Sequence, residues 1–221
     1  MAAKLNPLGH KTLYRFGSRP LFVGRQVAIG NYRAMSSITP NEINEPAGSI
    51  WQTVAAFREM ADDQRRGYLF ERFIREHLPW DFSPPRSVLT HTEQIDAAYG
   101  WRGRYFLVEA KAKRRPITPG SQDWEDFALK VREREGRCVG LYASLWPVSP
   151  GCDKAARRLN ERGVTTLILA GEEWDLFRDH SIDIAKLLEY MLYNATFSYE
   201  ARVKDLTPFI AWAEGICLAG N

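Results

Sequence analysis

Apolar positions along the chain switch between helical and strand spacing from residue 51 onward. The stretch "WQTVAAFREMADDQRRGYLFERFIREHL" predicts a helix, because its second half repeats large apolar residues every three or four positions. That periodicity runs from Phe70 to Leu78, and Pro79 ends it because proline cannot continue a helix. A long amphipathic helix is therefore expected before the first strands.

Strand-like and helix-like segments alternate after this helix. Strands are expected at 87–91, 94–99, 105–112, 138–146 and 164–170. Further helices are expected at 123–136, 153–163 and 183–197. Strands followed by helices and strands in alternation indicate an α/β fold, with a sheet flanked by helices.

The stretch "TEQIDAAYGWRGRYFLVEAKAK", residues 92–113, is typical of a β-hairpin but carries charged residues in its strands. A two-residue turn at Arg102 and Gly103 sets the pairing by counting along the strands. The expected pairs are Asp96 with Glu109, Gln94 with Lys111, and Ala98 with Leu107. Glu109 and Lys111 share one face because side chains alternate along a strand. A longer or bulged turn would shift this register by one residue.

Two carboxylates that face each other across neighbouring strands repel, so the arrangement calls for a cation between them. Lys111 is one candidate. Magnesium is the better candidate, because it takes hard oxygen ligands and is typically held by one or two carboxylates with waters or phosphate oxygens. A surface ion pair of Glu109 with Lys111 is the simplest alternative, but it leaves Asp96 unexplained.

A third acidic residue, Glu71, lies at the edge of the apolar stripe of the first helix. From there its carboxylate could lean over the sheet and reach a metal or the water around it. The alternative is a boundary residue that points to solvent or pairs with a neighbouring arginine. Arg72, Arg75 and Glu76 are expected well round on the polar side.

The ordered set of Glu71 in "GYLFE", Asp96 in "EQIDAA", and Glu109 with Lys111 in "VEAK" resembles the PD-(D/E)XK nuclease superfamily. Within it, the pattern is most similar to restriction-endonuclease-like proteins of the Mrr type, over roughly residues 62–200. The resemblance implies a mixed four- to five-stranded central sheet between helices, with an αβββαβ core. One departure is that Ile95 stands where the superfamily's first half-motif has proline.

The resemblance also implies roles for the residues of the motif. Mg²⁺, with Mn²⁺ as a substitute, would be held by Asp96, Glu109 and the backbone carbonyl of Ala110. Lys111 would orient or deprotonate the attacking water or balance charge at the phosphate. Glu71 would hold a second metal or a metal-bound water. Gln94 would position water, or it would simply form a cross-strand polar pair.

Basic residues near the hairpin are candidates for contact with phosphates without reading sequence. They are Arg102, Arg104, Lys113, Arg114, Arg115 and, on the following helix, Lys130. The alternative is that these charged side chains are only solvated. Trp101 beside the turn would either stack on a base or cover the sheet edge.

Charge is unevenly distributed over the 221 residues, whose net charge is +3. Residues 1–41 contain six lysines and arginines and no Asp or Glu, and "SSITPNEINEPAGS", 36–49, has the composition of a linker. We expect a basic extension at 1–50 and a nuclease domain at 51–221. The extension would be a nucleic-acid arm, an inert or packing extension, or an organelle transit peptide.

The expected function is that of a magnesium-dependent endonuclease acting on DNA in restriction or phage defence, as a homodimer or as part of a multi-protein system. A repair or RNA-directed nuclease of the same fold is one alternative. A catalytically inactive nucleic-acid-binding or assembly module is another. No apolar run approaches the roughly 20 residues of a membrane helix, and three widely spaced cysteines favour a reducing compartment, the prokaryotic cytoplasm.

Overall fold

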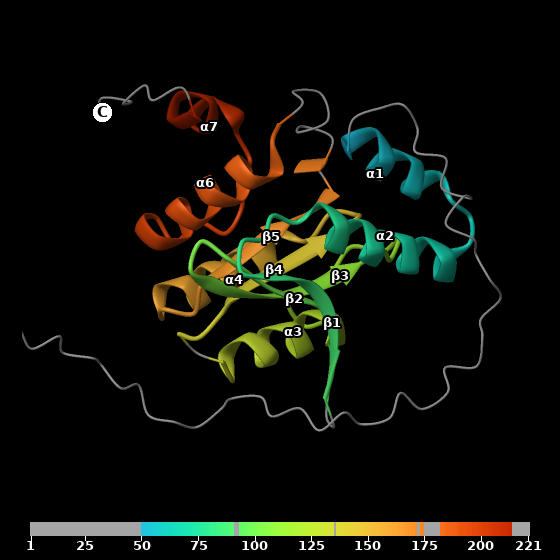
Figure 1. Ribbon diagram of the computed structural model, residues 1–221, viewed down its shortest axis with the longest axis horizontal. Coiled ribbons are helices and arrows are strands. Elements are labelled where there is room, and N and C mark those ends of the chain that lie inside the picture. Colours follow the sequence, from blue (N-terminus) through green and yellow to red (C-terminus); the bar gives the residue numbers. More distant parts are fainter. Residues whose placement is uncertain (1–49, 91–92, 135, 172, 175–181, 214–221) are drawn as a thin grey trace, which may run out of the picture. The chain divides into compact units, whose positions relative to one another are not determined.

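Five strands form one mixed sheet in the order β1-β2-β3-β4-β5 (Figure 1). The computed structural model describes residues 50–90, 93–134, 136–171, 173–174 and 182–213, and the expected basic extension lies outside them. The strands are β1 Ser83–Leu89, β2 Gln94–Trp101, β3 Arg104–Lys111, β4 Val139–Ser144 and β5 Thr166–Leu169. β1, β2 and β3 pair antiparallel, whereas β3, β4 and β5 pair parallel. The predicted mixed α/β sheet is confirmed.

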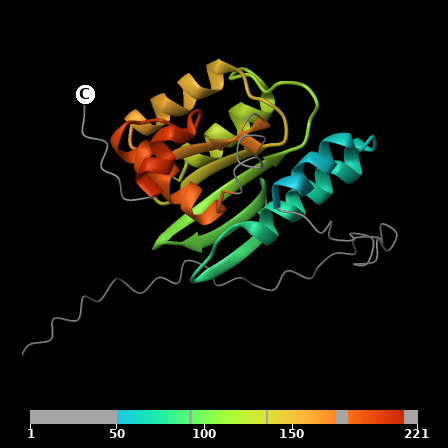
Figure 2. The ribbon, with the colours of Figure 1, turned by 90° about the horizontal axis from the view of Figure 1, so that it is seen from above.

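Helices cover both faces of this sheet, with α3 and α4 on one side and α1, α2 and α6 on the other (Figures 1 and 2). They are α1 Ile50–Glu59, α2 Asp63–His77, α3 Gln122–Arg132, α4 Pro150–Glu161, α6 Ile184–Phe197 and α7 Leu206–Ala213. From α2 to β4 the order is α-β-β-β-α-β, which is the predicted core. The short helix α7 was not expected from the sequence.

The single helix expected from residue 51 to 78 is two helices, because the chain is capped afresh at Asp62. The Asp62 carboxylate accepts hydrogen bonds from the backbone N–H groups of Gln64 and Arg65, at 3.0 and 2.9 Å. An aspartate in this position satisfies donors that the first helical turn leaves unpaired. As predicted, α2 ends just before Pro79. His77, which lies within the predicted apolar stripe, is exposed, and its ring contacts that of Phe73 at a tilt.

The core between the sheet and α3 and α4 determines which way β3 faces. Leu107 of β3 and Tyr142 of β4 are buried in one cluster with Trp124 and Phe127 of α3. Because side chains alternate along a strand, Glu109 projects to the same face as Leu107, toward α3. Packing of apolar neighbours therefore carries an acidic residue into the interior.

The hairpin between β2 and β3 has the predicted two-residue turn. Arg102 and Gly103 both have positive φ, 51° and 69°, which the tight turn of an antiparallel hairpin requires. The expected pairing of Ala98 with Leu107 is confirmed. Trp101 is buried and packs against Phe106, on the face of the sheet opposite to Leu107.

Candidate active site

Strands β2 and β3 stop pairing at the point where the acidic residues lie. Their regular ladder ends at Ala97 and Val108, and the pairing of β2 with β1 shifts by one residue in the same place. Just beyond, the Asp96 carboxylate accepts a hydrogen bond from the backbone N–H of Ala110, at 2.8 Å. A register shift of this kind, a β-bulge, commonly changes the direction in which a nearby side chain projects. Neither the expected pair of Asp96 with Glu109 nor that of Gln94 with Lys111 forms, since the regular ladder ends before both.

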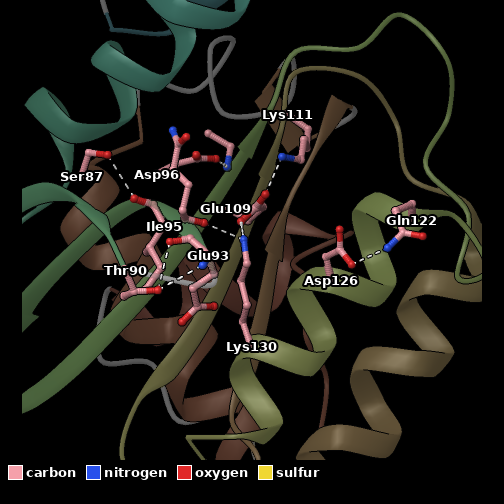
Figure 3. Close-up of polar contacts among 12 residues, drawn as sticks. Ser87, Thr90, Glu93, Ile95, Asp96, Glu109, Lys111, Gln122, Asp126 and Lys130 are labelled. Atoms are coloured by element: carbon pink, nitrogen blue, oxygen red, sulfur yellow. Dashed lines mark hydrogen bonds and ion pairs between the residues drawn. The ribbon is translucent and has the colours of Figure 1, made fainter. Parts of the chain in front are cut away.

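Glu109 is only 5% exposed and is bound by two lysines from different elements (Figure 3). Lys111, two residues further along β3, contacts one carboxylate oxygen, Oε1. Lys130 of α3 contacts the other, Oε2, at 2.9 Å, and also donates to the backbone carbonyl of Gln94 at 2.7 Å. The ion pair of Glu109 with Lys111 therefore exists, but it lies in the interior and includes a further cation.

Glu71 of α2 approaches this group from the other side of the sheet, with its side chain 30% exposed. Burial, followed by the charge of Asp96, raises the pKa of Glu71 to about 7, with Glu109 adding to the rise and Arg75 and Lys111 opposing it. The four residues of the motif line one cleft, which is why their charges influence one another.

Arg75 is a site residue that the sequence did not reveal. Its guanidinium lies 3.8 Å from the Glu71 carboxylate and donates to the backbone carbonyl of Asp96 at 3.1 Å. The helical wheel placed it on the polar side, but its position four residues after Glu71 was a usable signal, because such pairs meet on a helix.

The pKa values of two further residues of the motif, Asp96 and Lys111, are also shifted. Burial and then the charge of Glu109 raise the pKa of Asp96, against its hydrogen bond from Ala110 and the nearby lysines. Burial lowers the pKa of Lys111, but the attraction of Glu109 and Asp96 outweighs it and the net change is upward. An upward shift of the pKa at both an acidic and a basic group is what crowded negative charge produces.

Two hollows meet at these residues. The first, a cleft of about 590 Å³, is lined by Glu71, Glu93, Gln94, Asp96, Glu109, Lys111, Asp126, Leu129, Lys130 and Glu133. The second, a groove of about 770 Å³, is bordered by the start of α2 and the loop after β3, including Tyr68, Lys113, Arg114 and Arg115. Glu71 and Lys111 line both, so they stand where an acidic cleft adjoins a basic groove.

The donor atoms suit a hard cation. Asp96 and Glu109 supply carboxylate oxygens, which magnesium and manganese prefer, and one or two carboxylates are enough when waters complete the shell. Within the ranges that the structure describes, no cluster of three or more His, Cys, Asp or Glu side chains is arranged to hold a metal ion. Asp96 and Glu109 both line the cleft, and a metal held by them with the Ala110 carbonyl stays a prediction.

The residues proposed for nucleic-acid contact are divided by the fold. Arg102 and Arg104 lie at the hairpin turn, and Arg104 is about 17 Å along β3 from Glu109 at strand spacing, so the structure does not bring them to the site. Lys113 is paired with Asp123, at 2.6 Å. Arg114 and Arg115 line the groove. Lys130, expected on the rim, lies inside the site.

Comparison with known proteins gives one structural neighbour to report. The DNA modification-dependent restriction endonuclease AspBHI is similar over 75% of this chain, with 16% sequence identity and a TM-score of 0.39. The matched part is 44% of the length of that chain. At this identity and TM-score the likeness does not indicate a shared activity. No protein-family model matches the chain, and no curated protein matches it.

No helix in the described ranges is both long and apolar enough to cross a membrane.

Proposed function

We propose that the protein is a metal-dependent endonuclease that hydrolyses phosphodiester bonds of DNA. The observation that carries this proposal is the burial of Asp96 and Glu109, at 6% and 5% exposure, where β2 and β3 separate beside Lys111. Burying charged carboxylates together is costly, and a purely structural ion pair has no need of the second one. Such an arrangement is expected where cations and phosphate must be bound.

Asp96 and Glu109 would hold the metal, together with the backbone carbonyl of Ala110. Asp96 is pre-oriented for this by the N–H of Ala110, at 2.8 Å, which fixes one oxygen and leaves the other for a ligand. A divalent cation, when bound, supplies a Lewis acid that activates water and neutralises charge on a phosphate.

Lys111 and Glu71 have distinct roles in this proposal. Lys111 lines both the cleft and the groove, so its ammonium would contact the phosphate or orient the attacking water. Glu71, with a pKa of about 7, can gain or lose a proton near neutral pH, which suits a group that positions water or holds a second cation.

The groove beyond Lys111 supports a polyanionic substrate. Arg114 and Arg115 are exposed there, and Tyr68 offers an exposed ring at the start of α2. Arginines bind phosphates without reading sequence, and an aromatic face can stack on a base. The motif's resemblance to restriction-endonuclease-like proteins leads us to propose DNA as the substrate, a role in restriction or phage defence, and a homodimer for cutting both strands.

Cleavage assays test the proposal directly. Purified protein should cut plasmid or linear duplex DNA with Mg²⁺ or Mn²⁺ and not in EDTA. Asp96→Asn and Lys111→Ala should lose nearly all cleavage, whereas Lys154→Ala, a lysine-to-alanine change on the exposed side of α4, should retain it. Cleavage of RNA alone would redirect the proposal to an RNA nuclease of the same fold. Absence of cleavage of any nucleic acid with either metal would refute it.

One observation favours a second candidate, a catalytically inactive nucleic-acid-binding or assembly module. Both oxygens of Glu109 are paired with lysines, so this carboxylate is already neutralised by the chain itself. Such a protein would bind DNA with the same affinity in EDTA and in Mg²⁺ and would not cleave nucleic acid. Its melting temperature would not change when divalent metals are added.

A further inference from the structure

The two lysines on Glu109 are not equivalent. Lys111 follows Glu109 by two residues in β3, so both side chains project from the same face of one strand. Lys130 reaches across from α3, with its side chain 14% exposed, and its ammonium bridges Glu109 Oε2 and the backbone carbonyl of Gln94, at 2.9 and 2.7 Å (Figure 3). Lys130 therefore links α3 to Glu109, one of the carboxylates that we propose as metal ligands.

The three carboxylates of the motif lie among cations that the chain itself supplies. The carboxylates of Glu71, Asp96 and Glu109 are offset by Lys111 and Lys130 on Glu109 and by Arg75 near Glu71. A divalent cation entering beside Asp96 and Glu109 would add two positive charges within a few ångströms of both ammonium groups. Like charges at such separations repel strongly, so one ammonium must withdraw.

Lys130 is the lysine with other acidic side chains close to it on its own helix. Its helix neighbours Asp126, four residues before, and Glu133, three residues after, both line the same cleft. Residues three and four apart on a helix meet, so a rotation of the flexible lysine stem brings its charge to a new partner. Leu129, next to Lys130 in the chain, is exposed and also lines the cleft.

We propose that Lys130 is an internal counterion that holds Glu109 in the metal-free protein and withdraws toward Asp126 and Glu133 when a divalent cation binds. By competing for Glu109 it sets the metal concentration at which the site fills. This inference rests on the proposed metal-dependent function and makes Lys130 a positioning residue, not a catalytic one.

Metal titrations followed by thermal melting, without DNA, test the inference. Lys130→Met removes the charge while keeping much of the length and apolar character of the stem, and Lys130→Arg keeps the charge. Against wild type, Lys130→Met should melt at a lower temperature in EDTA, because a buried carboxylate loses one partner. It should reach half of its Mn²⁺- or Mg²⁺-induced shift at a metal concentration about tenfold lower, because a competing charge is gone.

The matched controls separate this effect from a general loss of charge. Lys130→Arg should need a metal concentration within about twofold of wild type, as should Lys154→Met, which removes a lysine from the exposed side of α4. Isothermal titration with Mn²⁺ should give the same order of affinities. If Lys130→Met does not fold, Lys130→Gln keeps a donor for the Gln94 carbonyl and makes the same prediction.

Two results would overturn the inference in different ways. If Lys130→Met and Lys130→Gln need the same metal concentration as wild type while Glu109→Gln loses the shift, the counterion role is wrong and the metal site stands. If wild type shows no metal-dependent shift at all, both the counterion role and the proposed metal-dependent function are wrong.

Discussion

The pKa of Glu71 leads to a measurable pH dependence of stability in the metal-free protein. Its side chain is 30% exposed, and burial together with the charges of Asp96 and Glu109 raises its pKa from 4.5 to about 7. The folded state therefore binds this proton more tightly than the unfolded chain. Below pH 4.5 the carboxyl is protonated in both states and the stabilising contribution is complete; it is lost as the pH rises through about 7.

The magnitude follows from the size of that pKa difference. A rise from 4.5 to 7 corresponds to about 3.4 kcal/mol between the two protonation states. Solvent screening at a partly exposed side chain reduces the expected effect to roughly 1–2 kcal/mol. Replacement by glutamine removes the titration, so wild type should lose this amount relative to Glu71→Gln between pH 5 and pH 8. At about 2–4 °C per kcal/mol, the melting temperatures should diverge by several degrees.

Urea unfolding in EDTA at pH 5, 6, 7 and 8 measures the difference directly, because titrations common to both proteins largely cancel. Glu76→Gln is the matched control, since Glu76 is on the same helix but exposed and paired with Arg72. Its difference from wild type should not fall as the pH rises through 7. A difference between wild type and Glu71→Gln that stays constant from pH 5 to pH 8 would show that Glu71 is an ordinary solvated carboxylate.

Three further predictions concern other parts of the chain. At pH 8 in EDTA, Asp96→Asn should be at least as stable as wild type, because burial disfavours the charged form of Asp96. Glu109→Gln should lose roughly 1–3 kcal/mol, because buried Glu109 is paired with two partly buried lysines. Urea unfolding measures both, and a stabilised Glu109→Gln would contradict the pairing. Arg102→Asn should raise the free energy of unfolding by roughly 0.5–1 kcal/mol, since asparagine tolerates positive φ better, and a loss would contradict this. Deleting residues 1–41 should weaken DNA binding and flatten its salt dependence if they contact phosphates, and an unchanged slope would reject the arm.

The hairpin and its acidic pair were accessible from the sequence because the interactions that define them are local. A two-residue turn with glycine sets the strand register, so Asp96 and Glu109 were expected near each other. The same counting places Arg102 and Arg104 at the far end of the strands, and the expectation that they surround the site could have been corrected without a structure. Asp62, a helix-capping residue, was likewise a local signal for the break between α1 and α2.

The cations around Glu109 were decided only by tertiary structure. Lys130 meets Glu109 because Trp124 and Phe127 of α3 are buried against Leu107 and Tyr142, and the sequence around Lys130 does not say which sheet residues these aromatic rings meet. Arg75 meets Asp96 for a similar reason, since its reach depends on how α2 packs over β2 and β3. Local sequence determines which residues a turn, strand or helix contains and which way they alternate. Which charges meet in the interior depends on packing between elements far apart in the chain, because that packing sets both the distances between them and their exposure to water.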